Sequence, residues 1–178
     1  DEVVRQAREM ADEGFKEVTL LGQTVSSYYE QGYDFADLLA RVHEVEGLHR
    51  IRYTSPYPND FTPRLVDALA RLPRVGHHIH LPVQSGSTAI LKDMRRGYTA
   101  ERFLRLIERI RSTLPHYALT TDIIVGYPGE TEADFEATLA LVREVGFDSA
   151  FMFAYSEREG TLAARKRIDD VPDSVKKS

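Results

Sequence analysis

The chain has 178 residues, of which 42% are hydrophobic and 29% charged, a composition typical of a globular domain with a buried core. It carries 23 Lys and Arg against 28 Asp and Glu, so its net charge of −5 gives no overall basic surface of the kind that nucleic-acid-binding domains use. No apolar run approaches the ~20 residues that cross a bilayer, and no signal peptide is recognisable. These features predict a cytoplasmic protein without a membrane partner, and they leave its oligomeric state open.

The sequence contains no cysteine. This excludes disulfides, thiolate zinc sites and cysteine nucleophiles, and it leaves the chain without the thiolates that ordinarily hold an iron–sulfur cluster. His77, His78 and His80 lie close together, but a strand would place only His78 and His80 on one face, without a third ligand nearby. We therefore predict no metal site and interpret these residues as packed or hydrogen-bonded histidines.

Three short basic clusters stand out: Arg50 with Arg52, Arg95 with Arg96, and residues 165–167. Because the overall charge balance is acidic, we interpret them as solvated surface.

Segments with a helical pattern alternate with segments with a strand pattern along the whole chain. The helical segments carry apolar side chains three or four residues apart, and N-cap residues, glycine or proline mark their ends. The expected helices run from Val3 to about Gly14, from Asp34 to Gly47, from Thr62 to just before Pro73, over about 87–95, from Thr99 through Ile110, and from Thr131 through Val145. Thr62 with Pro63 and Thr131 with Asp134 are the clearest helix starts.

Five short apolar segments between these helices predict strands. They are residues 17–21, 50–54, 78–81, 118–125 and 148–155. Strands separated by helices form right-handed crossovers and a parallel sheet, so we predict an α/β fold. A complete pattern would begin with a strand, whereas this chain begins with a helix. We therefore expect that a first strand and its loop are missing and that the polar residues 169–178 form a linker.

Each predicted strand is followed by a loop rich in polar residues, glycine or proline, and ligands of parallel α/β folds bind at the carboxyl ends of the strands. In GYPGET (126–131), Gly126 and Gly129 permit backbone conformations that are closed to other residues. The amides at the following helix start could receive an anionic or polar ligand group. A tight turn without a ligand is the alternative, and the Gly-Lys-Ser/Thr ending of a P-loop is absent.

The loop PVQSGS (82–87) offers the amide of Gln84 and the hydroxyls of Ser85 and Ser87, which suit sugar hydroxyls or a carboxylate. A helix cap is the alternative interpretation. After the first strand, GQTVSSY (22–28) could present a carbonyl and an amide to an ammonium group.

Asp122 lies within a predicted strand. If its side chain points to the interior it is a buried carboxylate that needs a partner, and hence a candidate site residue; if it points outward it pairs with a helix. Several tyrosines also lie in or near strand-end loops, where they could stack on bases or plug the end of the sheet. They are Tyr28, Tyr29, Tyr53, Tyr57, Tyr127 and Tyr155.

Five long motifs, in order, resemble the radical S-adenosylmethionine (SAM) methylthiotransferases. They are RYTSPYPNDF (52–61), HIHLPVQSGS (78–87), MRRGYT (94–99), TTDIIVGYPGETEADF (120–135) and FDSAFMFAYSEREGT (147–161). The resemblance runs through nearly all 178 residues. It favours the MiaB branch, which adds a methylthio group to N6-isopentenyladenosine beside the tRNA anticodon. The RimO branch, which modifies an aspartate of a ribosomal protein, is the alternative.

The resemblance implies a partial (β/α) barrel of the radical SAM type over residues 1–168, with about five parallel strands. The first strand and its CxxxCxxC loop, which would hold a 4Fe–4S cluster, are missing, and residues 169–178 lead toward an absent C-terminal domain. SAM and 4Fe–4S clusters are the implied cofactors of the full-length parent, and tRNA is its implied substrate. Because the cysteine ligands are absent, this chain alone is expected to show no turnover and offers no catalytic side chain.

The resemblance also implies which residues contact SAM. Gly22 and Gln23 match a motif near the methionine amino group. The methionine carboxylate or the ribose of SAM would be contacted by Gln84, Ser85, Ser87, Thr121 and Asp122. The adenosyl group would lie against Gly126 and Gly129. The adenine would be contacted by the backbone of Met152, Phe153 and Tyr155. Outside this family, the motifs leave open a barrel enzyme that binds a phosphorylated metabolite at GYPGET, or a non-catalytic RNA-binding scaffold.

Overall fold

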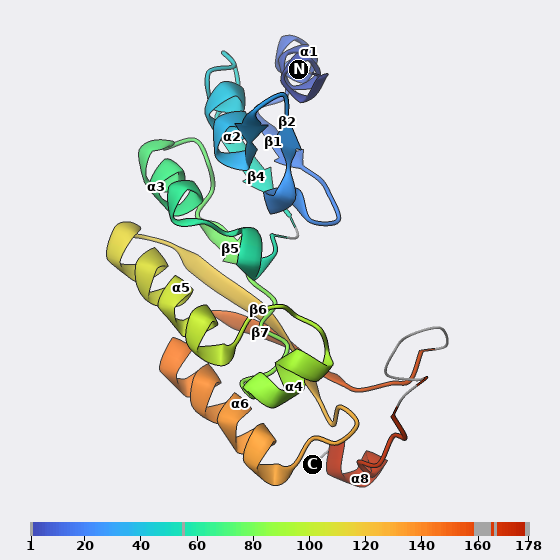
Figure 1. The fold of residues 1–178 in the computed structure, drawn as a ribbon. Helices are drawn as coiled ribbons and strands as arrows, with labels where there is room; N and C mark the ends of the chain where they lie inside the picture. The colour runs from blue at the N-terminus through green and yellow to red at the C-terminus, as the bar shows by residue number, and fades with distance from the viewer. Residues whose placement is uncertain (1, 55, 159–164, 166, 177–178) are drawn as a thin grey trace. The chain divides into compact units, whose positions relative to one another are not determined.

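The computed structural model describes residues 2–54, 56–158, 165 and 167–176. The chain divides into two units, each with its own packed elements (Figure 1). The first contains residues up to Leu81 together with Glu108–Leu119, and the second contains Pro82–Ile107 and the residues from Thr120 onward. Helix α5 (Ala100–Thr113) and strand β6 (Ala118–Val125) run through the division, so each contributes to both units.

The first unit is built on the parallel strands β1 and β4. Its elements are α1 (Glu2–Asp12), β1 (Glu17–Leu20), α2 (Phe35–His43), β4 (Arg50–Tyr53), α3 (Pro63–Arg71) and β5 (His78–His80). Alternate residues of both strands are buried, as the two-residue repeat of a half-buried strand requires. On the other face of this sheet, Arg50 and Arg52 both pair with Glu17.

The segment just before β5 pairs with β4 through a parallel bridge. Ile51 forms a parallel bridge with Val75 just before β5, and the N–H of Ala118 at the start of β6 donates to the carbonyl of His77. The predicted parallel, helix-alternating organisation is therefore confirmed.

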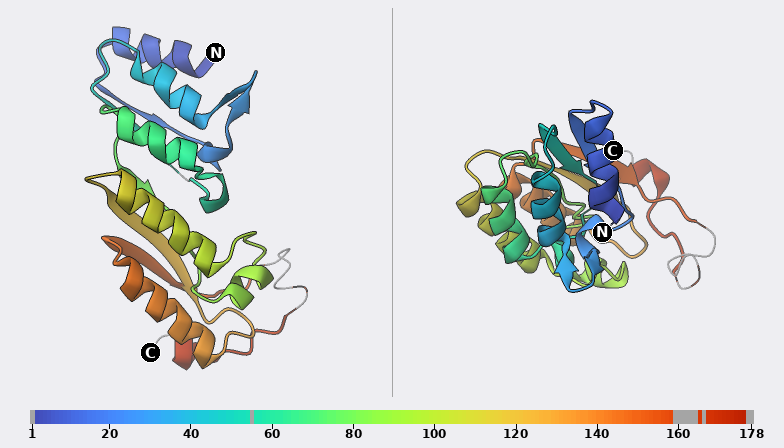
Figure 2. Two further views of the ribbon diagram at one scale, coloured as in Figure 1. Left: turned by 60° about the vertical axis from the view of Figure 1, so that its left-hand side comes forward. Right: turned by 90° about the horizontal axis from the view of Figure 1, so that it is seen from above.

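The second unit holds parallel strands β6 (Ala118–Val125) and β7 (Ser149–Ala154), paired from Thr120↔Ser149 to Val125↔Ala154. Its helices are α4 (Thr88–Asp93), α5 (Ala100–Thr113), α6 (Glu132–Val145) and the short α8 (Asp173–Lys176). Figures 1 and 2 show α5 and α6 side by side over one face of β6 and β7. Phe103, Ile107, Leu141 and Val145 from these helices are buried.

The predicted helix starts are confirmed. The Thr62 hydroxyl accepts the N–H of Leu65, and Thr131 and Asp134 form a reciprocal capping box at the start of α6. The helix predicted from Asp34 ends at His43 rather than at Gly47, because the backbone after it turns and Val45 N–H bonds to Val42.

Two features were not predicted. Residues 29–34 form a small antiparallel hairpin of β2 (Tyr29–Glu30) and β3 (Tyr33–Asp34), in which Gln31 and Gly32 both have positive φ values, of 51° and 88°. This is the backbone of a two-residue hairpin turn, and glutamine is a weak sequence signal for it. Short 3-10 helices also occur at η1 (Val25–Ser27) and η2 (Pro58–Asp60). Over the described residues, none of the helices is long and apolar enough to span a membrane.

Candidate functional site

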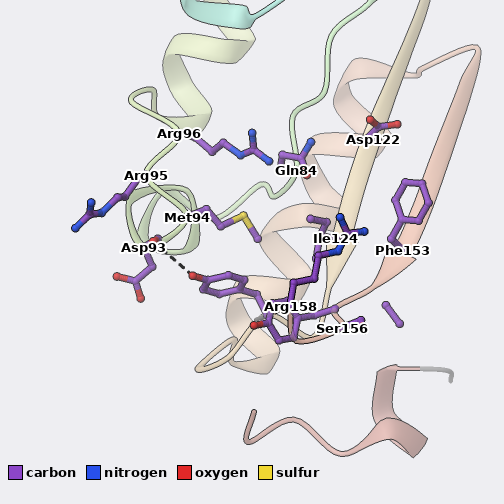
Figure 3. A pocket seen from close by; sticks show the side chains of 13 residues that line it. Gln84, Asp93, Met94, Arg95, Arg96, Asp122, Ile124, Phe153, Ser156 and Arg158 are labelled. Carbon is purple, nitrogen blue, oxygen red and sulfur yellow. Dashed lines mark hydrogen bonds between the residues drawn. The ribbon is translucent and has the colours of Figure 1, made fainter. Parts of the chain in front are cut away.

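A pocket of about 670 Å³ lies in the second unit, at the carboxyl ends of β6 and β7 (Figure 3). Its lining comes from Gln84, residues 93–96, Asp122, Ile124, Tyr127, residues 153–156 and Arg158. This is the end of a parallel sheet at which α/β folds bind their ligands, and the volume falls within the roughly 300–1,000 Å³ of small-molecule sites.

Three arginines and two aspartates line the pocket beside aromatic rings. Figure 3 shows Gln84 and Arg96 close together, and Asp122 and Phe153 on neighbouring strands. Asp122 therefore faces the pocket, which decides between the two orientations that the sequence left open. The tyrosines Tyr127 and Tyr155 also line the pocket, and their rings meet edge to face with centroids 5.4 Å apart.

Strained backbone is concentrated here. Among the described residues, the non-glycine residues with positive φ are Gln31, Gln84 and Arg95, and the last two line the pocket. Left-handed backbone at a side-chain-bearing residue costs about 1–2 kcal/mol and is found disproportionately at binding sites. For Gln84 (φ 71°), two backbone bonds to the strand compensate: its N–H donates to the Asp122 carbonyl and its carbonyl accepts the Ile124 N–H, both at 2.9 Å.

Ser85, Ser87 and Thr121 are buried, and their hydroxyls bond to protein groups. The Thr121 hydroxyl accepts the N–H of Val83 at 2.9 Å, and the Ser85 hydroxyl lies 3.3 Å from that of Thr138. Ser87 caps α4 by accepting the Ile90 N–H. The helix-cap interpretation of this loop is therefore confirmed for Ser87. None of the three lines the pocket, so their assignment to SAM stays a prediction.

The GYPGET segment forms a turn whose sequence explains its shape. Pro128 and Gly129 occupy the two central positions, Gly129 has φ 83°, and the Glu130 N–H donates to the Tyr127 carbonyl at 2.8 Å. Proline followed by a glycine of positive φ is the pattern of a type II turn. The N–H of Gly126 donates to the carboxylate of Glu130, whose pKa is raised mainly by burial.

The segment before α8 lies against the same turn. Asp170 accepts the N–H of Gly129 at 2.7 Å, and Arg167 pairs with Asp93 of α4. The N–H groups of Gly126 and Gly129 are therefore bonded to carboxylates of the chain itself. Gly126 and Gly129 do not line the pocket, and their contact with an adenosyl group stays a prediction.

Lys176 of α8 fills the space beside Gly126. Its side chain is 2% exposed, and its ammonium group bonds the carboxylate of Asp169 at 2.6 Å and lies 3.5 Å from the carbonyl of Tyr155. A methyl group on Gly126 would lie 2.4 Å from Cγ of Lys176. Residues 169–176, which we predicted as a linker, thus contact the second unit, and the domain boundary at 168 stays a prediction.

The remaining predicted site residues lie elsewhere. Gly22 and Gln23 are exposed and follow β1 in the first unit, and Met152 is exposed on β7 outside the pocket lining. Of the twelve residues, the structure brings Gln84, Asp122, Phe153 and Tyr155 together in one pocket.

Arg95, Arg96 and Arg158 were not predicted as site residues. We interpreted the pair Arg95 and Arg96 as solvated surface. Arg95 is exposed, as expected, whereas Arg96 is half-buried, and both belong to the pocket lining. Net charge did not indicate the pocket, because it says nothing about where a turn places two side chains. The available signal was their position in MRRGYT, one of the motifs that carry the family resemblance.

Asp134 links two helix starts, and this makes its role testable. It accepts hydrogen bonds from Ser87 and from Thr131, and these two groups, in that order, lower its pKa below the ordinary 3.8. The pKa of Asp134 is lower in the folded state than in the unfolded state. The ionised carboxylate therefore stabilises the folded state fully above pH 3.8, and this stabilisation is lost as the pH falls through the folded-state pKa.

We expect Asp134→Ala to reduce the free energy of unfolding by about 1–2 kcal/mol at neutral pH. The difference from the wild type should shrink toward pH 3, as measured by urea titrations at both pH values. Glu136→Gln, on the exposed side of α6, is the control and should stay within about 0.5 kcal/mol. A deficit of equal size at both pH values would contradict this account.

The sequence profile of the Radical SAM superfamily matches residues 1–142. The chain belongs to the radical SAM superfamily. It is 52% identical to the tRNA-2-methylthio-N(6)-dimethylallyladenosine synthase of Moorella thermoacetica, over 99% of this chain and 40% of that protein. The chain thus spans about two fifths of the length of this relative.

Solved structures support the same superfamily fold. SuiB of Streptococcus suis bound to S-adenosylmethionine superposes with a TM-score of 0.57 and 17% identity, covering 89% of this chain and 34% of that one. HemN of Escherichia coli, a coproporphyrinogen III oxidase described as a radical SAM enzyme, superposes with a TM-score of 0.51 and 15% identity. The match covers 96% of this chain and 51% of that one. The predicted fold class, an α/β fold of the radical SAM type with parallel strands, is therefore confirmed.

The two cofactors of radical SAM proteins differ in their fit to this chain. Amide, carboxylate, guanidinium and aromatic groups converge in the pocket, and they are the partners that the amino acid, ribose and adenine parts of SAM require. The thiolates that ordinarily hold a 4Fe–4S cluster are not available from this sequence, which has no cysteine. Within the described part of the chain, no group of three or more His, Cys, Asp or Glu residues could hold a metal ion either.

Proposed function

We propose that the chain is the SAM-binding core of a tRNA methylthiotransferase. The full-length enzyme would add a methylthio group to N6-isopentenyladenosine beside the anticodon, in the cytoplasm. The observation that carries this proposal is the 52% identity over 99% of the chain to a tRNA-2-methylthio-N(6)-dimethylallyladenosine synthase. The strand-end pocket in the second unit supports it, because its polar and aromatic groups suit a nucleoside bearing an amino acid.

In this proposal the pocket residues bind and orient SAM, which supplies the reactive groups when bound. Asp122 and the Gln84 side chain would hold polar groups of the ribose or the methionine part. Tyr155 and Phe153 would enclose the adenine. Arg96, beside Gln84, is the group best suited to the methionine carboxylate, because guanidinium recognises carboxylates with paired hydrogen bonds.

Gly22, Gln23, Ser85, Ser87, Thr121, Gly126, Gly129 and Met152 are proposed to contact SAM on the family resemblance alone. No step of the reaction is assigned to an iron–sulfur cluster, because this chain lacks the cysteines for one. We accordingly expect no methylthiotransferase turnover from the 178-residue chain alone, with tRNA or with a ribosomal protein.

Calorimetric titration of the chain with SAM tests the proposal, with S-adenosylhomocysteine as a comparison. We expect saturable binding, and a loss of affinity of about tenfold or more in Asp122→Asn and in Gln84→Ala, because a hydrogen bond to a charged group contributes about 1.5–3 kcal/mol. Asp148→Asn, on an exposed aspartate outside the pocket, should bind SAM as the wild type does.

Cooperative thermal melting of each variant shows that it is folded. A folded wild-type chain that does not bind SAM, or an Asp122→Asn variant with unchanged affinity, would contradict the proposal.

The alternatives left open by the sequence are less well supported. A RimO-type activity on a ribosomal protein is separated from the tRNA activity by assaying the full-length parent on both substrates. For a phosphorylated metabolite at GYPGET, the N–H groups of Gly126 and Gly129 are already engaged, because they bond to Glu130 and Asp170.

A further inference from the structure

Strand β7 exposes large apolar side chains in an unusual run. Phe151, Met152 and Phe153 are 60%, 73% and 53% exposed. Because side chains of a strand alternate between its faces, Phe151 and Phe153 lie on one face and Met152 on the other. In the parallel register they neighbour Asp122 and Ile124 of β6.

This face is continuous with the pocket. Asp122, Ile124 and Phe153 all belong to the pocket lining (Figure 3). Phe151 precedes Phe153 by one two-residue step of β7. A step of two strand residues is about 6.6–6.8 Å, roughly twice the thickness of an aromatic ring. The two phenylalanines therefore form a short aromatic track that leads from the pocket along the sheet.

Exposing two phenylalanines is costly unless something covers them, since burying such a side chain is worth about 1.5–3 kcal/mol. Neighbouring exposed apolar groups mark binding surfaces. The charge beside the track indicates what binds: Arg158 lines the same pocket and is exposed, in a chain whose net charge is −5. Flat aromatic rings next to guanidinium groups are the combination that recognises unpaired nucleotides, with rings stacking on bases and arginines contacting phosphates.

We propose that Phe151 forms a stacking platform for an unpaired base of RNA at the rim of the pocket, next to Phe153, with Arg158 contacting the adjoining phosphate. This rests on the proposed function, and it identifies the part of this chain that holds the RNA. Base stacking explains why the exposed residues are aromatic. The pocket groups then remain available for SAM.

A stem-loop RNA carrying 2-aminopurine at an unpaired loop position tests the platform, because the fluorescence of this base falls when it stacks. Titrated with the 178-residue chain, the probe should be quenched, whereas the same strand in a full duplex should not. Phe151→Ala should abolish most of the quenching and weaken binding by about tenfold, as expected for the loss of one stacked base.

Matched variants separate stacking from other roles. Phe151→Tyr keeps a ring and should retain quenching, whereas Phe151→Leu keeps an apolar side chain and should not. Phe15→Ala, at an exposed phenylalanine of the first unit, should behave as the wild type. Arg158→Ala should weaken binding and reduce the salt dependence by about one phosphate contact, while the bound probe stays quenched.

The proposal is overturned if the wild-type chain does not bind the stem-loop, if Phe151→Ala quenches it fully, or if Phe151→Leu equals Phe151→Tyr. The last result would indicate an apolar partner such as a protein segment. SAM titration of the same samples keeps the two proposals apart. If Phe151→Ala loses the quenching but still binds SAM, the stacking platform is supported. If the wild-type chain stacks the RNA base but does not bind SAM, only the proposed function is contradicted.

Discussion

Replacing Gly86 with alanine should reduce the free energy of unfolding by about 3 kcal/mol or more. A methyl group there would lie 2.4 Å from the Ala137 carbonyl oxygen and 2.6 Å from Cα of Thr138. Both are backbone atoms within α6, so the contact cannot be relieved by moving a side chain. The Gly86 N–H also donates to the Thr138 hydroxyl at 2.9 Å, and the shift needed to avoid the clash would break this bond.

Urea or guanidinium denaturation measures this loss, and Gly76→Ala is the matched control. A methyl group on Gly76 would lie 3.6 Å from the nearest atom, the Ile51 carbonyl oxygen, which is ordinary contact, so its stability should change by less than about 1 kcal/mol. Because the loop of Gly86 holds Gln84, we also expect Gly86→Ala to lose SAM binding. Equal stability of the two variants would show that the loop does not approach α6 as closely as described.

Replacing Gly126 with alanine should cost about 2–4 kcal/mol, from two sources. The backbone at Gly126 is left-handed, with φ 70°, which costs a side-chain-bearing residue about 1–2 kcal/mol. The new methyl group would also overlap the stem of Lys176, whose side chain is 2% exposed and cannot simply swing aside. Expelling it would leave Asp169 without its ammonium partner and remove the packing of α8.

Gly129→Ala separates these sources. Gly129 has a φ of 83°, and the atom nearest to the added methyl group would be a guanidinium nitrogen of Arg167 at 3.4 Å. Gly129→Ala should therefore show the conformational cost with little steric conflict. In a Lys176→Ala background, Gly126→Ala should cost about as much as Gly129→Ala does alone. The double-mutant cycle is read from denaturation midpoints. An unchanged cost of Gly126→Ala without Lys176 would disprove the contact.

Sequence reasoning was most accurate where the interactions that form an element are local. The capping box of Thr131 and Asp134 spans one helical turn, and the strand of residues 118–125 was recognised over its full length. It was least accurate where a backbone conformation is imposed by partners distant in the chain. The left-handed backbone of Gln84, for example, is held by hydrogen bonds to Asp122 and Ile124 of β6.

For the candidate site residues, the sequence showed which side chains are polar but not which of them line the pocket. Ser85 and Ser87 carry similar hydroxyls to any ligand, yet the structure directs them to Thr138 and Asp134, residues some fifty positions away in the chain. Gln84, between them and the sheet, lines the pocket instead. The difference arises from the register of the loop against β6, which is a tertiary contact.

The sequence by itself determined the alternation of helices and strands, the parallel arrangement that follows from it, the absence of thiolate ligands and, through five motifs in order, the family. Each of these depends on residue identity and on spacing along the chain. Only the tertiary structure decided that Asp122 faces a pocket, that three arginines join it there, and that Lys176 packs against Gly126. These outcomes depend on which loops meet at the end of the sheet, where small differences in packing and hydrogen bonding between distant segments decide the orientation of each side chain.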